Sequence, residues 1–146
     1  MVGVDGSAAS RAALRWAAEE ARLRGAALVA LHAWAYVPPP PIGEPGMIPL
    51  PAGDLAGQLE AERAAAEAEL DAALADAFPE GEPEGLERRL VEGDPAEVLE
   101  AEAARADLLV VGSRGRSGFA SVLLGSVTRH VVDHAPCPVV VVKASG

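Results

Sequence analysis

The chain has 146 residues, half of them hydrophobic, and a formal net charge of −10. Its length suits one domain with a single core, and its apolar content argues against a disordered chain. The acidic balance argues against nucleic acid or an anionic membrane as the main partner, although a small anion responds to a local site. Apolar runs are far shorter than the roughly 20 residues that span a bilayer, and the N-terminus lacks a signal-peptide pattern. We therefore expect one cytoplasmic domain over residues 1–146.

The first half of the chain predicts two strand–helix units that are separated by a long loop. A short apolar strand at residues 1–5 leads into a helix with Ser7 as its N-cap and Gly25 as its stop. The apolar run at residues 27–37 predicts a strand buried on both faces. Residues 38–53 are too rich in proline and glycine for regular structure, so we expect a functional or mobile loop there.

The second half continues the alternation of helices and strands. Asp94 is the expected N-cap of one helix, with Pro95 in its first turn and Glu97 at the capping-box position. The predicted helices are residues 55–78, 95–106 and 126–135, and the predicted strands are residues 86–93, 107–112 and 138–142. Parallel pairing with right-handed crossovers then gives a doubly wound five-stranded α/β sheet, Rossmann-like in the order 3-2-1-4-5, with helices on both faces.

Such sheets bind ligands beyond the carboxyl ends of their strands, where the strand order reverses. Two predicted loops meet at that edge. One is "VDGS" after the first strand, and the other is "VVGSRGRSGFASVLLGS", residues 110–126, after the fourth. Their convergence is the strongest physical argument for a site.

The glycine-rich loop fits neither of two familiar phosphate motifs. The spacing of Gly112, Gly115 and Gly118 differs from G-x-G-x-x-G, and no lysine is present for a Walker A loop. Gly125 and Ser126 nevertheless precede a helix, whose free N–H groups favour an anion. The residues alone leave two alternatives open, a phosphate cradle and an ordinary loop with a helix cap. Arg114 and Arg116 either neutralise phosphate charge or are simply solvated.

The pattern Gly112-x2-Gly115-x9-Gly125-Ser126 resembles the ATP-binding signature of universal stress proteins, G-2x-G-9x-G-(S/T). The likeness extends over nearly the whole chain, through "VGVDGS", "LHAW", "EGDPAEVLEAEAARADLLVVGSRGRSG", "LLGSV" and "CPVVVV". The resemblance implies a dimeric, regulatory stress-response protein that binds ATP, with or without Mg²⁺. In the family, several residues usually precede the equivalent of Val2 in the first strand, whereas this sequence starts at Met1. We therefore expect a shortened first strand that holds Asp5 less firmly.

The resemblance assigns roles to particular residues. Asp5 would meet the adenosine moiety, Ala33 would line the adenine pocket, and the signature glycines would hold ribose and phosphates. Ser126 would donate to a phosphate. The implied ATP-binding set is Val4, Asp5, Ala33, Gly112, Ser113, Arg114, Gly115, Gly125, Ser126 and Val127. Two protomers would pair through the C-terminal strand, residues 138–142, which is an apolar edge.

Other functions stay open as alternatives. A slow ATPase or nucleotide-handling enzyme of the same fold is one, and a partner-binding dimer with an empty pocket is another. His130 and His134 have metal-like spacing without the glutamate of H-E-x-x-H, so we expect no metal there. His32 is interpreted as a packed histidine and Cys137 as a small buried hydrophobe. Bound nucleotide would order the loop at residues 37–53 or a lid at residues 116–124.

Overall fold

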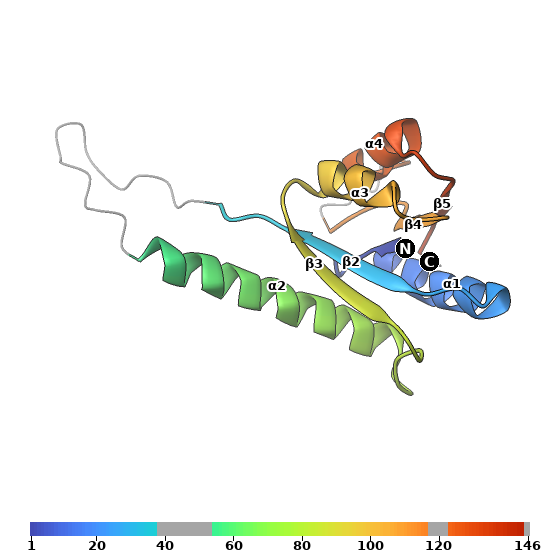
Figure 1. Cartoon of the computed structure of the whole chain (residues 1–146), viewed down its shortest axis with the longest axis horizontal. Helices are drawn as coiled ribbons and strands as arrows, with labels where there is room; N and C mark the ends of the chain where they lie inside the picture. Colours follow the sequence, from blue (N-terminus) through green and yellow to red (C-terminus); the bar gives the residue numbers. More distant parts are fainter. Residues whose placement is uncertain (38–53, 117–122, 145–146) are drawn as a thin grey trace.

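The computed structural model describes residues 1–37, 54–116 and 123–144 (Figure 1). The predicted loop at residues 38–53 and most of the predicted lid, including Gly118, lie outside these ranges. The elements are β1 (Val2–Gly3), α1 (Ala8–Arg24), β2 (Val29–Trp34), α2 (Leu55–Ala77), β3 (Glu87–Glu92), α3 (Pro95–Ala103), β4 (Leu109–Gly112), α4 (Ser126–His134) and β5 (Val139–Val142). All strand pairs are parallel in the order β3-β2-β1-β4-β5, which confirms the predicted fold.

Three helix caps form where the sequence predicts them, although α3 ends at Ala103 and not at the predicted residue 106. The Ser7 hydroxyl accepts a hydrogen bond from the Ser10 amide at 3.1 Å and caps α1. Gly25 ends that helix in a left-handed conformation, with φ of 62°, which a side chain would disfavour. Asp94 Oδ1 accepts from the amides of Ala96 and Glu97, so the predicted cap of α3 is confirmed.

The sheet is covered on both faces (Figure 1). Helices α1 and α2 pack on one face, and α3 and α4 pack on the other. Because β1, β2 and β4 lie in the middle of the sheet, their apolar residues are removed from water on both sides. The largest fully buried side chains of the core are Val2, Leu14, Leu31, Leu70, Leu74, Leu109, Val110 and Val131.

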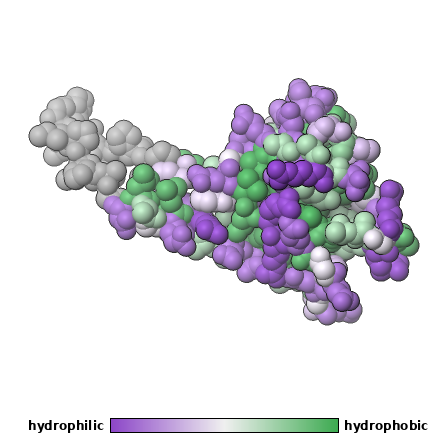
Figure 2. Space-filling view, in the orientation of Figure 1, coloured by the Kyte–Doolittle hydropathy of each residue, from purple (hydrophilic) through white to green (hydrophobic). Residues whose placement is uncertain are grey.

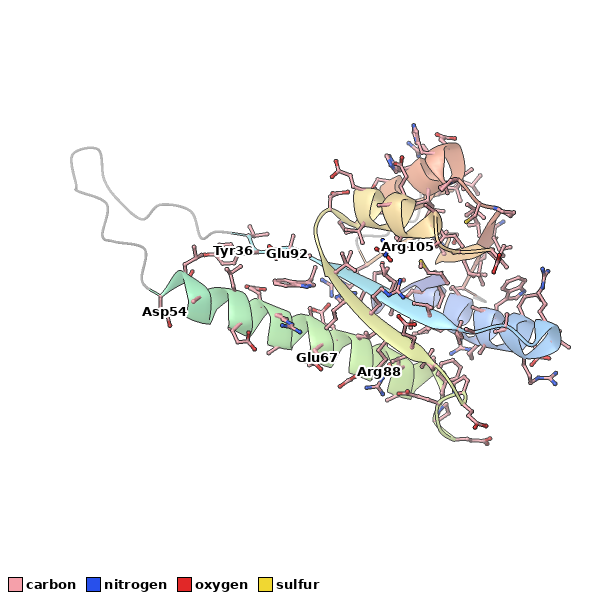
Figure 3. The ribbon with its side chains drawn as sticks, in the orientation of Figure 1. Tyr36, Asp54, Glu67, Arg88, Glu92 and Arg105 are labelled. Atoms are coloured by element: carbon pink, nitrogen blue, oxygen red, sulfur yellow. The ribbon has the colours of Figure 1, made fainter. Side chains whose placement is uncertain are left out.

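Helix α2 packs on the sheet through its C-terminal part, and its N-terminal part extends beyond the sheet (Figure 1). Leu70 and Leu74 are buried, whereas Leu55 is 51% exposed. Arg88 of β3 donates to Asp71 of α2 at 2.9 Å and ties the edge strand to the helix (Figure 3). Toward the other end of α2, the Tyr36 hydroxyl donates to Gln58 at 2.5 Å. The apolar spacing of the sequence therefore predicts the helix, but only part of it contributes to the core.

Hydrophilic side chains dominate the visible surface, and apolar ones show between them near the sheet and along α2 (Figure 2). Within the ranges that the structure describes, we find no helix with the length and apolar content required to cross a membrane.

Candidate functional site

A cavity of about 380 Å³ opens at the carboxyl ends of β1, β2 and β4, where the strand order reverses. This is the edge at which the two predicted loops converge. The cavity is lined by every residue of the set predicted from the sequence except Ser113. Its volume falls within the roughly 300–1,000 Å³ that is usual for small-molecule sites.

Ser113 holds the two ends of the glycine loop together and does not line the cavity. The residue is 2% exposed, and its amide donates to the Val142 carbonyl at 2.7 Å. Its carbonyl accepts from the Gly125 amide at 2.9 Å. These bonds fix the start of α4 beside the end of β4. Ser113 therefore organises the loop through its backbone from outside the cavity lining, and its place in the ATP-binding set stays a prediction.

Asp5 lies in the turn between β1 and α1, against the glycine loop. Its Oδ1 accepts a hydrogen bond from the Ser7 amide at 3.0 Å. Its Oδ2 occupies the space beside Gly115, where an added Cβ would lie only 2.7 Å from that oxygen. Gly115 therefore gives the Asp5 carboxylate room at the cavity, and a larger residue would displace it.

The other two signature glycines have different surroundings. A Cβ at Gly112 would lie 2.8 Å from the backbone of Ala9 and Ser10, because α1 packs directly on β4 there. A Cβ at Gly125 would meet nothing closer than 3.5 Å, the distance to the Arg114 Cα. Gly112 thus serves the packing of α1, even though it also borders the cavity.

Helix α4 points its N-terminus into the cavity without a capping side chain. Its N-cap, Gly125, provides no side-chain hydrogen bond, whereas Ser7 and Asp94 cap α1 and α3 at the same edge of the sheet. Ser126 and Val127 of the first turn line the cavity. The amides of a first helical turn have no partners within the helix and carry the positive end of its dipole. This end of the cavity therefore suits an anion.

The two loop arginines differ in their partners. Arg116 Nη1 contacts Glu69 Oε2 of α2 at 2.5 Å. Among the described residues, no carboxylate lies within ion-pair distance of Arg114, which also lines the cavity. The Ser7 hydroxyl donates to the Arg114 carbonyl at 3.2 Å and joins this loop to α1. An arginine without an acidic partner, in a chain of net charge −10, adds local positive potential beside α4.

The sequence interpretation did not include several residues of the cavity wall. His32 is 7% exposed and donates from Nδ1 to the Val4 carbonyl at 2.7 Å, so it packs as predicted and also borders the cavity. Thr128 donates to the Gly112 carbonyl at 2.7 Å. The remaining apolar wall is formed by Gly3, Leu31, Pro95, Leu99 and Val111. These residues come together at the cavity only through strand pairing. Of them, only His32 could have been found from the sequence, because it is next to Ala33.

The histidines of α4 lie away from this cavity and have other partners. His130 Nε2 contacts Glu100 at 2.6 Å, and His134 donates to the His130 carbonyl at 2.9 Å. In the part of the chain that the structure describes, no cluster of metal-ligating side chains is present. Cys137 is half-buried and packs against the core on the α3 and α4 side.

Comparison with known proteins identifies the family. The sequence model of the universal stress protein family matches residues 1–143. The chain belongs to the universal stress protein family. It is 41% identical to a universal stress protein from Mycolicibacterium smegmatis over 98% of this chain and 45% of that protein. This universal stress protein chain therefore spans about half the length of the curated relatives it matches.

Solved structures of the family show the same fold. The universal stress protein UspA from Lactobacillus plantarum is 30% identical with a TM-score of 0.71, over 97% of this chain and 95% of that one. A universal stress protein in complex with cAMP is 30% identical with a TM-score of 0.57, over 99% and 94% of the two chains. One from Archaeoglobus fulgidus in complex with dAMP is 26% identical with a TM-score of 0.51, over 97% and 94%. Two structural relatives of this universal stress protein are thus nucleotide complexes.

Proposed function

We propose that this universal stress protein binds an adenine nucleotide, specifically ATP, in the cavity at the switch point of its sheet, and that it acts as a regulatory module. The observation that carries the proposal is the α4 N-terminus, which has no side-chain cap and faces the cavity beside Arg114. Backbone amides of this kind bind phosphate through hydrogen bonds and the helix dipole. The cAMP and dAMP complexes of structural relatives support the same ligand class.

The cavity has an apolar side and a polar side, as a nucleotide requires. Leu31, Ala33 and Leu99 form apolar wall near β2 and α3, and a purine ring stacks well against such groups. Gly115, Ser126 and Arg114 lie on the phosphate side. The Asp5 carboxylate lies at the cavity and accepts hydrogen bonds, so ribose hydroxyls are suitable partners. The proposed ligand therefore spans the cavity from β2 to α4.

Pairing of two protomers through β5 is the second part of the proposal. In the described sheet, β5 is an edge strand, and its four residues are valines. An apolar edge with unpaired backbone groups favours association with a second copy. A dimer would join two nucleotide sites into one regulatory unit.

Variants of Gly115 and Asp5 test the nucleotide site. We expect Gly115→Ala to weaken ATP binding at least about tenfold, or about 1.4 kcal/mol, because its methyl group displaces the Asp5 carboxylate. In an Asp5→Ala background, the same glycine substitution should have little further effect, since the displaced group is gone. Calorimetric titration of the four proteins with ATP measures this coupling, and urea unfolding checks that each is folded. Unchanged affinity in folded Gly115→Ala contradicts the assignment.

A further inference from the structure

We propose that Glu69 is a positioning residue for Arg116 and gives the site a preference for nucleotides with more than one phosphate. The inference rests on the proposed nucleotide function and adds to it the class of phosphate chain that the site selects. Glu69 lies on α2, far in sequence from the glycine loop, and the resemblance assigns it no role.

Glu69 contacts Arg116, a residue of the cavity wall, from a fixed part of α2. The next residue, Leu70, is 2% exposed and anchors the helix on the sheet. The Glu69 Oε2 atom lies 2.5 Å from Arg116 Nη1 and 3.8 Å from His32 Nε2. His32 is itself fixed by its hydrogen bond to the Val4 carbonyl. One carboxylate oxygen of α2 is therefore paired with Arg116 of the glycine loop and lies near His32 of β2.

The ion pair holds Arg116 without using all of its donors. The structure gives the guanidinium one hydrogen bond to Glu69, through Nη1, and a guanidinium has five N–H groups. The remaining N–H groups are available to a phosphate oxygen, with which arginine forms strong charge-assisted bonds. Arg116 is 61% exposed, so its side chain would otherwise sample many rotamers. Ordering it before the ligand arrives reduces the entropy cost of binding.

The two arginines then serve different phosphates. Arg114 and the α4 N-terminus provide positive charge for the first phosphate with no help from Glu69. Arg116 stands two residues further along the loop, also lines the cavity, and is held by α2. A second or third phosphate would engage it, whereas a monophosphate would be bound without it. Loss of Glu69 should therefore affect ATP more than AMP.

A double-mutant cycle with two nucleotides tests this inference. We expect Glu69→Ala to weaken ATP binding about fivefold, leave AMP binding unchanged, and have no further effect in an Arg116→Ala background. Glu67→Ala is the matched control, because it removes an exposed carboxylate from the same helix and should leave both affinities unchanged (Figure 3).

Calorimetry at constant ionic strength separates the outcomes. The positioning role would be overturned if Glu69→Ala weakened ATP and AMP binding equally or made ATP binding tighter. It would also be overturned if Glu69→Ala weakened ATP binding as much in the Arg116→Ala background as in the wild type. A wild-type protein that binds neither nucleotide would overturn the proposed function as well, so the two failures are distinguishable.

Discussion

Gly112, Gly115 and Gly125 share one sequence signature, but their surroundings in the fold differ. A Cβ at Gly112 would clash with the α1 backbone and one at Gly115 with the Asp5 carboxylate, whereas one at Gly125 would make only ordinary contacts of 3.5 Å or more. Substitutions at the three positions should therefore have different consequences for folding and for binding. The spacing of the glycines is visible in the sequence, but their neighbours come from other elements and appear only in the folded chain.

Gly112→Ala should destabilise the fold by about 1–3 kcal/mol, which is the usual cost of overpacking. The added methyl group would lie 2.8 Å from backbone atoms of Ala9 and Ser10, and a helix backbone yields less easily than a side chain. Gly125→Ala is the matched control and should change the free energy of unfolding by well under half of that. Urea unfolding monitored by circular dichroism measures both. Equal unfolding midpoints for Gly112→Ala and the wild type would contradict the packing role.

Arg114 and Arg116 show the limit of sequence interpretation at single residues. Both are loop arginines, and from the sequence alone each is equally expected to contact a phosphate. Their difference depends on Glu69, which is 47 positions away from Arg116 and reaches it because α2 packs on the sheet. The same reason explains why Leu31 and Leu99 of the apolar wall were not predicted.

At the scale of elements, the caps were predicted because they are local. Ser7, Gly25 and Asp94 act on amides or carbonyls within a few residues, so the sequence contains both partners. The doubly wound parallel sheet followed from the alternation of strands and helices together with right-handed crossovers. Helix α2 was predicted at nearly its observed length, but its exposed N-terminal part was not, because apolar spacing does not show where the sheet ends.

The N-caps of α1 and α3 give a prediction that separates folding from binding. Ser7→Ala and Asp94→Ala each remove a side-chain cap and should each lower the free energy of unfolding by about 1 kcal/mol. Ser7 also donates to the Arg114 carbonyl, so only its loss should loosen the glycine loop. We expect Ser7→Ala to weaken ATP binding at least about threefold, against little change for Asp94→Ala. Similar affinities for the two variants, measured by calorimetry, would show that this bond does not organise the site.

At the scale of the whole molecule, the proposed dimer depends on the free edge of β5. The Pro138 carbonyl accepts from the Leu109 amide of β4 at 3.0 Å, and the Val142 carbonyl accepts from the amide of Ser113, just after β4, at 2.7 Å. Because successive residues of a strand alternate in the side to which their backbone groups point, the Val141 amide faces away from β4. That amide is available to a second protomer.

Val141→Pro should therefore shift the protein from dimer to monomer, since proline removes this donor and is tolerated at sheet edges. Val141→Ala is the control, because it shortens the side chain, which packs on the core, but keeps the amide. Sedimentation velocity measures the oligomeric state of both variants and of the wild type. A dimer that persists in folded Val141→Pro would place the interface elsewhere.

Nucleotide binding by the wild-type protein is the claim on which the site, the loop arginines and the role of Glu69 all depend. The most direct measurement is a calorimetric titration with ATP, combined with denaturation of the same preparation to detect nucleotide that was already bound. We predict saturable binding of one ATP per chain, or release of adenine nucleotide on denaturation. No heat of binding at ATP concentrations up to the millimolar range, together with no released nucleotide, would contradict a nucleotide site in this cavity.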